Sequence, residues 1–352
     1  MKKKYIISKE FSNTIVLVGD IGGTNARLRL SQLKNEKKDI LHNAVYKVRD
    51  YDSIIDVIKP FLKEYKDYPI KSICLAIAGP IINNTVKVTN SNWNIDARKL
   101  KEALKIDNIQ LINDFAAIGY GIESISNDKL YPLQKVSNGI IKKDGLKAFI
   151  GAGTGLGVGF ASLDKLQYVV HPTEGGHASF APADDTQISI LIYLRKKYSK
   201  DISAENLLSG SGIRDIYQYF REVNPSHYSE NQELKMILAD KTKDAAKEIT
   251  TFALKHPNDL MSVKTVETFV KIYGSKSADI IFSLLPSGGL YIVGNIAENI
   301  LGEKSYRDIF MKAFANKDKI SYILNEFPVW LVKDTKIGLE GAENCAFKLA
   351  LS

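Results

Sequence analysis

Hydrophobic and polar residues along the first fifty positions follow the pattern of β-strands. Segments that are rich in β-branched residues or alternate between apolar and polar residues recur in succession, over residues 14–20, 26–33 and 41–48. Strands that follow one another at short intervals usually pair with their neighbours in the chain. We therefore predict an antiparallel three-stranded meander at the start of the chain.

The hydrophobic spacing becomes helical after residue 50. Ile54, Ile58 and Phe61 recur at helical intervals, and Pro60 within that pattern predicts a kink or two shorter helices. The elements predicted next are a buried apolar strand over 70–80, a short helix from about Asp96 and a strand over 109–115. The first part of the chain thus has the order strand, strand, strand, helix, strand, helix, strand.

A second meander begins near residue 146. Segment 146–163 contains a strand, a glycine-rich turn and a second strand, and residues 166–170 supply a third. The later predicted elements are helices near 187–198, 205–220, 231–255 and 262–284, strands over 288–295 and 328–332, and a closing helix over 338–352. Because both halves start alike, we predict a duplicated α/β unit that binds a small molecule in a cleft between the halves.

Composition narrows the class of protein. The chain has 352 residues, of which 45% are hydrophobic and 25% charged, as in ordinary globular proteins. No apolar stretch approaches the roughly 20 residues that span a bilayer, and the basic start lacks the hydrophobic region of a signal peptide. Cys74 and Cys345 lie in apolar segments, without the spacing of a zinc or redox motif. We therefore predict a cytoplasmic protein with buried thiols and no membrane partner.

The net charge of +8 comes from basic residues scattered along the chain. Charge alone bears on solubility and nonspecific binding, so we interpret it as a solvated basic surface. No helix-turn-helix, zinc-finger or aromatic-basic signature accompanies it, and we predict no nucleic-acid partner.

Two glycine-rich turns carry the candidate chemistry. "DIGGTNAR" follows the first strand, and "GAGTGLGV" occupies the corresponding place in the second meander. Glycine lets a backbone approach a ligand closely, and exposed turn N–H groups beside a Thr hydroxyl form an anion-binding concavity. The alternative is a pair of tight hairpin turns that bind nothing. Two related turns in corresponding places favour phosphate binding.

Other phosphate-binding motifs do not fit these turns. A P-loop requires Gly-Lys followed by Ser or Thr in a fixed frame, which the chain lacks. A dinucleotide fingerprint must open a helix, whereas the glycines at 151, 153, 155 and 157 lead into a strand pattern.

Five motifs in order resemble one known family. "VGDIGGTNARLRL", "LINDF", "GAGTGLGV", "EGGHASFAP" and "SAENLLSGSG" look like those of the bacterial-type ATP-dependent glucokinases. The resemblance runs from about residue 15 to the C-terminus. It implies the two-domain, actin-like (ribonuclease H-like) ATPase fold, with duplicated βββαβαβα units and a central cleft. The small domain would comprise residues 1–121 with 338–352, and the large domain residues 122–337.

The resemblance also implies how the nucleotide is bound. Asp20 would help to hold Mg²⁺, which needs only one or two protein carboxylates because it stays largely hydrated. The alternative is that Asp20 only shapes the turn. The residues implied in binding ATP with Asp20 are Gly22, Gly23, Thr24, Asn25, Gly153, Thr154, Gly155, Gly288, Gly289 and Gly294. Relatives commonly carry a glycine where this chain has Asn295, which bears on nucleotide affinity or base preference.

Asp114 is the implied catalytic residue. It ends an apolar strand, where a carboxylate can accept the proton of a sugar hydroxyl during phosphoryl transfer. The alternative is that Asp114 caps the helix that follows.

The residues that the resemblance implies in binding glucose are Asn90, Asn113, Asp114, Glu174, His177 and Glu205. Amides and carboxylates suit this task, because a site built to hydrogen-bond hydroxyls rejects sugars that lack them. For His177 a purely structural role is the alternative. A zinc site is disfavoured because the chain has no cysteine cluster to complete one.

Two other functions stay open at this level. One is the phosphorylation of another hexose, such as mannose, fructose or an amino sugar. The other is a sugar- or ATP-binding regulator without transfer chemistry. Relatives often form homodimers, but no feature of this sequence decides the oligomeric state.

Overall fold

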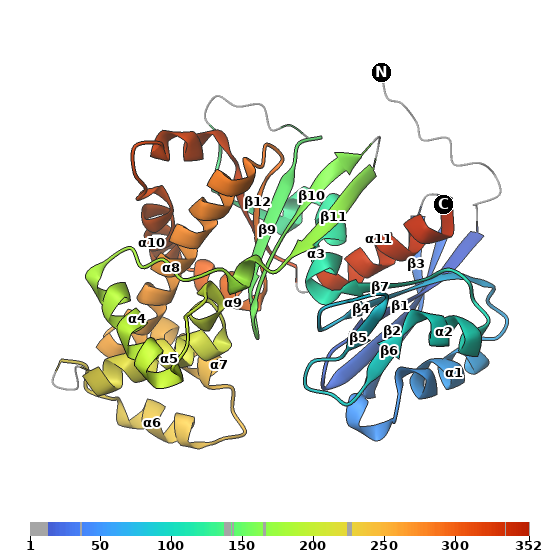
Figure 1. Ribbon diagram of the computed structural model, residues 1–352, viewed down its shortest axis with the longest axis horizontal. Coiled ribbons are helices and arrows are strands. Elements are labelled where there is room, and N and C mark those ends of the chain that lie inside the picture. Colours follow the sequence, from blue (N-terminus) through green and yellow to red (C-terminus); the bar gives the residue numbers. More distant parts are fainter. Residues whose placement is uncertain are drawn as a thin grey trace. The chain divides into compact units, whose positions relative to one another are not determined.

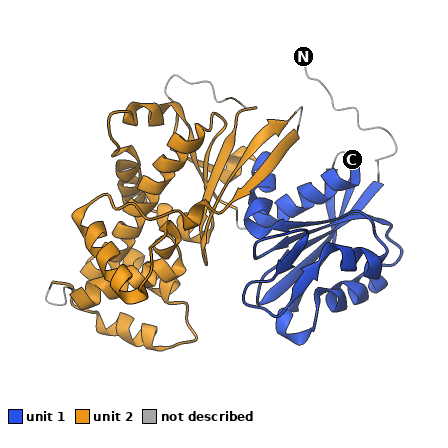
Figure 2. Ribbon diagram, viewed as in Figure 1, with its two compact units in different colours: residues 1–125, 336–352 blue, residues 126–335 orange. Residues whose placement is uncertain are grey.

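The computed structural model describes residues 13–351, apart from 36, 137–141, 143, 165–166, 224–226 and 335. The basic start of the chain, the first residue of the predicted strand 166–170 and Ser352 lie outside this part. The chain divides into two compact units (Figure 2). Unit 1 comprises residues 1–125 and 336–352, and unit 2 comprises residues 126–335.

The sheet of unit 1 has the strand order β3-β2-β1-β4-β7 (Figure 1). Its strands are β1 (Asn13–Ile21), β2 (Asn25–Lys34), β3 (Lys37–Lys47), β4 (Ile70–Ile77) and β7 (Ile109–Asn113). The first three form the predicted antiparallel meander, and β4 and β7 run parallel to β1. A hairpin of β5 (Thr85–Lys87) and β6 (Asn94–Asp96), which the sequence analysis did not predict, lies between β4 and the helix after it.

Helices cover both faces of this sheet (Figure 1). They are α1 (Ile54–Glu64), α2 (Ala97–Leu104), α3 (Asp114–Glu123) and α11 (Ile337–Leu351). Alternate residues of β1 point to opposite faces, as the strand period of two requires. Leu17 packs with residues of α1 and α2, whereas Val16 and Val18 pack with residues of α3 and α11.

Pro60 does not divide α1, which is one continuous helix. A proline inside a helix costs roughly 3 kcal/mol, because it removes a backbone hydrogen bond and clashes with the preceding turn. Val57, Ile58 and Phe61 are fully buried against the sheet. Their burial, roughly 1.5–3 kcal/mol for each large side chain, offsets that cost.

The sheet of unit 2 repeats the strand order of unit 1. Its order is β11-β10-β9-β12-β13-β8, with an antiparallel meander, two parallel strands and one extra antiparallel edge strand. The strands are β8 (Leu130–Gln134), β9 (Lys147–Ala152), β10 (Leu156–Asp164), β11 (Gln167–Thr173), β12 (Gly289–Val293) and β13 (Val329–Val332). The predicted duplicated α/β unit is therefore confirmed by the topology.

The helices of unit 2 lie between β11 and β13 in the sequence. They are α4 (Asp185–Tyr198), α5 (Gly210–Val223), α6 (Gln232–Ala239), α7 (Ala245–Lys255), α8 (Leu260–Leu284), α9 (Asn295–Leu301) and α10 (Lys304–Ala315). The predicted helices near 187–198 and 262–284 are confirmed. Helices α9 and α10 and strand β8 were not predicted.

Two predicted helices of this unit are wrong in extent. The helix over 231–255 is divided, because the Asp240 carboxylate accepts the backbone N–H of Thr242 and Asp244 caps the start of α7. Such local bonds compete with a continuous helix. The helix over 205–220 begins only at Gly210, after a 3-10 turn over Ala204–Asn206.

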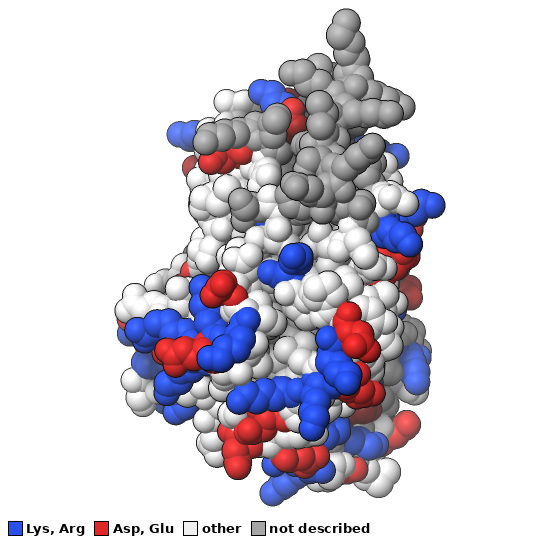
Figure 3. Space-filling view, turned by 90° about the vertical axis from the view of Figure 1, so that its right-hand side faces the viewer, with Lys and Arg blue, Asp and Glu red and all other residues white. Residues whose placement is uncertain are grey.

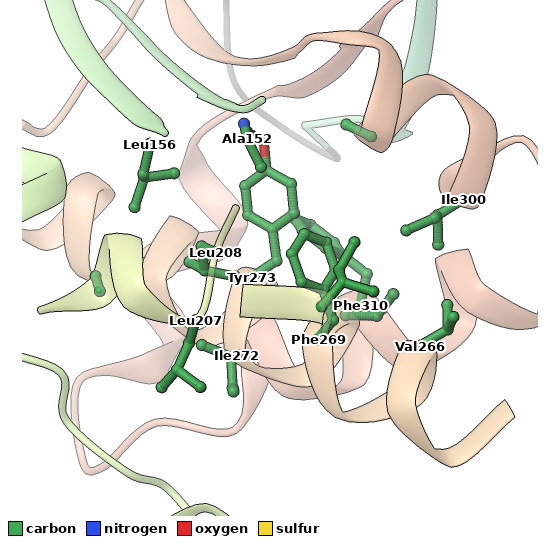
Figure 4. Packing of buried hydrophobic residues seen from close by; sticks show 14 of the residues in the cluster. Ala152, Leu156, Leu207, Leu208, Val266, Phe269, Ile272, Tyr273, Ile300 and Phe310 are labelled. Atoms are coloured by element: carbon green, nitrogen blue, oxygen red, sulfur yellow. Dashed lines mark hydrogen bonds between the residues drawn. The ribbon is translucent and has the colours of Figure 1, made fainter. Parts of the chain in front are cut away.

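Aromatic residues of α8 and α10 form the centre of the core of unit 2 (Figure 4). Tyr273 is fully buried, and its hydroxyl donates to the Ile150 carbonyl and accepts from the Ala152 N–H, each at 3.3 Å. Loss of hydration raises the pKa of this phenol, so it stays a neutral donor. Tyr273 thus fixes the carboxyl end of β9, immediately before the second glycine-rich turn.

Acidic and basic side chains lie side by side on the face of the molecule drawn in Figure 3. Among the described residues, no helix is long and apolar enough to cross a membrane.

Candidate active site

The carboxyl ends of three parallel strands meet at one edge of the sheet of unit 1. Ile21 pairs with Ile77, and Ile77 pairs with Asn113. Asp20 and Asp114 therefore both lie at this edge, which is where open α/β sheets bind ligands.

The first glycine-rich turn packs against the hairpin that carries Asn90. The Gly22 N–H donates to the Asn25 carbonyl at 3.0 Å, which closes the turn. A Cβ on Gly23 would lie 2.5 Å from the Thr89 carbonyl oxygen and 3.0 Å from the Asn90 Cβ. Only glycine permits this approach, so the turn at Gly23 and the predicted sugar ligand Asn90 are neighbours. Asn90 is exposed and has a φ of 59°, a left-handed conformation that Asn tolerates.

Asp20 forms an ion pair with Arg27, its partner across the β1–β2 pair. The Arg27 Nη1 lies 2.8 Å from Asp20 Oδ2, and both side chains are partly exposed. The Asp20 carboxylate therefore faces solvent with one oxygen engaged, and it can still be approached by a hydrated cation.

Asn113, and not Asp114, caps the helix that follows β7. The Asn113 Oδ1 accepts the N–H groups of Phe115 and Ala116, and its Nδ2 donates to the Gly79 carbonyl at 3.1 Å. Asp114 is the first residue of α3, so the capping alternative for Asp114 is wrong. The predicted strand over 109–115 likewise ends at Asn113.

The Asp114 carboxylate is exposed at the start of α3. Its Oδ1 accepts the Phe115 N–H at 2.8 Å. Partial loss of hydration raises the pKa of Asp114, and the negative charge of Asp20 raises it further, against the opposing effect of the Phe115 hydrogen bond. A carboxylate with a raised pKa is a stronger base than an ordinary aspartate.

Three predicted sugar ligands of unit 2 lie together, although they come from two segments of the chain. His177 Nε2 lies 3.7 Å from Glu174 Oε2, and His177 Nδ1 lies 3.7 Å from Glu205 Oε1. The segments are joined by backbone bonds, from Phe180 N to the Ile202 carbonyl and from Ala204 N to the Ala178 carbonyl. We call Glu174, His177 and Glu205 the polar triad. Its members are at least partly exposed, so they are accessible to a polyol.

A cavity of about 1190 Å³ adjoins the second glycine-rich turn. Ala152, Gly153 and Thr154 line it at the end of β9, and Gly294 and Asn295 line it at the end of β12. The Gly210 N–H donates to the Gly153 carbonyl at 2.9 Å, which brings the start of α5 to the same place. Gly153 and Thr154 of the second predicted phosphate turn therefore line the cavity, as does Asn295, where relatives commonly carry a glycine.

Sequence reasoning missed much of the cavity lining. Lining residues that it did not single out include Gly210, Ser211, Arg214, Lys247, Thr250 and Glu298. The available signal was "SGSG" at 209–212, which ends in the first turn of α5, because the other residues lie on helices at positions outside the motifs.

Gly288 and Gly289 do not line this cavity. Gly289 pairs with Lys147 at the start of β9, five residues from Gly294 and so about 16 Å along the strand. A Cβ on Gly288 would lie 2.5 Å from the Gly145 carbonyl oxygen, and Gly289 has a φ of +107°. Backbone packing and conformation favour glycine at both positions, and their role in nucleotide binding stays a prediction.

A family model described as Glucokinase matches residues 17–349. The chain belongs to the glucokinase family. The chain is 37% identical over 351 residues to the glucokinase of Trichormus variabilis, with 96% of this chain and all of the relative covered. It is 33% identical to the glucokinase of Synechocystis, with 94% and 97% covered. The family assignment makes the chain an ATP-dependent hexose kinase that transfers phosphate to glucose.

Solved structures share the fold of this chain. The glucokinase of an Antarctic psychrotroph has a TM-score of 0.79 and 27% identity, with 95% of this chain and 99% of that chain covered. The Balamuthia mandrillaris glucokinase, solved with glucose, has a TM-score of 0.76 and 20% identity, with 99% and 96% covered. A ROK-family glucokinase of Streptomyces griseus, solved with glucose and AMPPNP, has a TM-score of 0.61 and 18% identity, with 95% and 99% covered. The predicted two-domain α/β fold of the actin-like ATPases is therefore confirmed.

Proposed function

We propose that Asp114 is the general base that accepts a proton from a glucose hydroxyl while the phosphoryl group of ATP is transferred. The observation that carries this proposal is the exposed carboxylate of Asp114, whose pKa is raised, at the strand edge that also bears Asp20. Phosphoryl transfer needs little covalent help, so a positioned base and neutralised charge supply most of the catalysis.

Glucose would be bound by Asn90 and Asn113 in unit 1 and by the polar triad in unit 2. These side chains offer amide, carboxylate and imidazole groups, which can both donate to and accept from hydroxyls. The Asn113 oxygen is used in capping α3 and its Nδ2 donates to the Gly79 carbonyl, so Asn113 would contact a sugar hydroxyl through the same Nδ2 group. Backbone hydrogen bonds between segments 178–180 and 202–204 hold the polar triad together.

ATP would occupy the cavity next to Gly153, Thr154 and Gly294. Its volume of about 1190 Å³ and its Lys247 and Arg214 suit a polyanionic nucleotide, and turn N–H groups suit phosphate. Gly22, Gly23, Thr24 and Asn25 would contact phosphate from unit 1. We leave Gly288 and Gly289 out of this site.

Mg²⁺ would be held by Asp20. A single carboxylate beside the substrate phosphates satisfies the usual coordination of Mg²⁺, which keeps several waters. When bound, the ion would neutralise charge that develops on the phosphates. The Asp20 carboxylate can take this role only if Arg27 releases it or shares it.

We expect Asp114→Asn to fold and bind nucleotide normally but to lose two to four decades of kcat, about the contribution of a positioned general base. ADP release with ATP, Mg²⁺ and glucose measures the rate, and calorimetric ADP binding checks the fold. Asp107→Asn, an exposed aspartate before the same strand, is the matched control and should retain wild-type turnover.

A near-parental rate in Asp114→Asn would remove Asp114 from this role. A hexose panel that includes mannose, fructose and glucosamine in the same assay defines the substrate range. Hexose-independent ADP release would instead indicate a simple ATPase.

A further inference from the structure

Glu205 contacts the second glycine-rich turn as well as the polar triad. Its Oε2 accepts the backbone N–H of Leu156 at 2.9 Å, and its Oε1 faces His177 Nδ1 at 3.7 Å. One oxygen of the Glu205 carboxylate thus contacts the glycine-rich turn, and the other faces the polar triad. The side chain is about a third exposed, so a ligand can still reach it.

The absence of a side chain at Gly155 leaves space for the Glu205 carboxylate. A Cβ on Gly155 would lie 2.5 Å from Glu205 Oε2, so only glycine leaves room for the bond. On the other side of the same peptide segment, a Cβ on Gly176 would lie 2.0 Å from the Leu156 carbonyl oxygen. Leu156 is therefore where three segments meet: the turn, the "EGGH" motif and the residue Glu205.

Glu205 is itself held in place. Ser203 and Asn206 form a reciprocal capping box around the 3-10 turn that carries it, with Ser203 N donating to Asn206 Oδ1 at 2.9 Å. The turn over 153–155 is closed by the Gly153 N–H, which donates to the Gly155 carbonyl at 2.8 Å. Because Gly153 and Thr154 line the cavity, one hydrogen bond and one turn connect Glu205 to the cavity.

We propose that Glu205 is a positioning residue for nucleotide binding, which couples the polar triad to the phosphate turn. The proposal rests on the proposed function and deepens it. A sugar hydroxyl that donates to Glu205 restrains the carboxylate that holds the turn. Glucose therefore increases nucleotide affinity, and nucleotide increases glucose affinity by the same factor, as linkage requires.

The test is calorimetric binding of ADP in the absence of sugar, a condition in which a mere sugar ligand has no effect. Glu205→Ala should weaken ADP binding about tenfold, the scale of a lost charged hydrogen bond. Glu205→Gln keeps an oxygen that can accept the Leu156 N–H, so its ADP affinity should stay within about twofold of wild type while its KM for glucose rises.

Glu174→Ala is the matched control, because Glu174 belongs to the triad and makes no hydrogen bond to the turn among the described residues. It should raise the KM for glucose and leave ADP affinity within about twofold, since it removes only a sugar-side group. Glucose should tighten ADP binding to wild type and to Glu174→Ala at saturating sugar, but not to Glu205→Ala.

Hydrogen exchange of residues 153–157 distinguishes a local effect on the turn from a general folding defect. Glu205→Ala should increase exchange in this segment, whereas a general loss of structure would increase exchange throughout unit 2 and overturn the local role. Wild-type ADP affinity in Glu205→Ala also overturns the inference. Failure of the wild-type protein to bind ADP would overturn the proposed nucleotide site itself, which is a different result.

Discussion

At the scale of the residue, Asn113 shows how a single side chain organises the carboxyl edge of the sheet of unit 1. Its oxygen caps α3 and its amide holds the Gly79 carbonyl, so it fixes the position at which Asp114 leaves the strand. A sugar ligand and a helix cap are compatible roles, because the amide nitrogen carries a second hydrogen.

We predict that Asn113→Ala lowers the free energy of unfolding by about 1 kcal/mol, the usual contribution of an N-cap. Asn113→Ser should keep most of that contribution, because serine also caps helices well. Urea denaturation of the two variants measures the difference. Both variants should raise the KM for glucose if Asn113 also binds sugar. Equal stabilities for the Ala and Ser variants would show that the cap contributes nothing.

At the scale of the element, helices α3 and α11 cross at unusually short distance. A Cβ on Gly341 would lie 1.7 Å from the Ala117 carbonyl oxygen, and one on Gly121 would lie 2.4 Å from the Ile337 carbonyl oxygen. Glycine on each helix therefore lets the two backbones touch. This contact holds the C-terminal helix on the same face of the sheet as the helix that begins at Asp114.

We predict that Gly341→Ala destabilises the protein by about 2 kcal/mol, because the helices must separate to admit the methyl group. Gly338→Ala is the matched control on the same helix, since its nearest atom lies 4.0 Å away. It should be neutral or stabilising by about 0.5–1 kcal/mol, the usual gain of replacing glycine in a helix. Thermal denaturation compares them, and equal melting temperatures would contradict a close crossing.

At the scale of the molecule, unit 1 is assembled from both ends of the chain. Ala342, Cys345, Ala346 and Phe347 of α11 cover one face of its sheet, where Val16 and Val18 lie. Unit 2 has a separate core that contains no residue of α11. The unit that bears Asp114 can therefore be complete only after α11 has been synthesised.

We predict that truncation after residue 335 exposes that face of the sheet and makes the protein aggregate, because a contiguous apolar face would lose its cover. Aggregation is measured by the soluble fraction after expression and by light scattering of the purified protein. A truncated protein that stays monomeric with an unchanged melting temperature would show that α11 is dispensable.

Much of the fold could be predicted from local pattern. The meanders, the helices near 187–198 and 262–284 and the duplicated unit follow from periodicity, which acts over a few residues. The helix over 231–255 was wrong because the Asp240 and Asp244 side chains bond to the backbone within it. A glycine required by packing and one required by a ligand look alike in a sequence, so the nucleotide role of Gly288 and Gly289 stays a prediction.

The sequence by itself determined the family, the two strand meanders and the residues to consider at the site, since each follows from a short motif or a local pattern. The tertiary structure alone decided that Asn113 and not Asp114 caps α3, and that Arg214 and Lys247, which belong to no motif, line the cavity. It alone showed that Glu205 bonds to Leu156, which lies 49 positions earlier in the chain. The physical reason is that hydrogen bonds and close packing between distant segments depend on how the chain folds back, which no local spacing records.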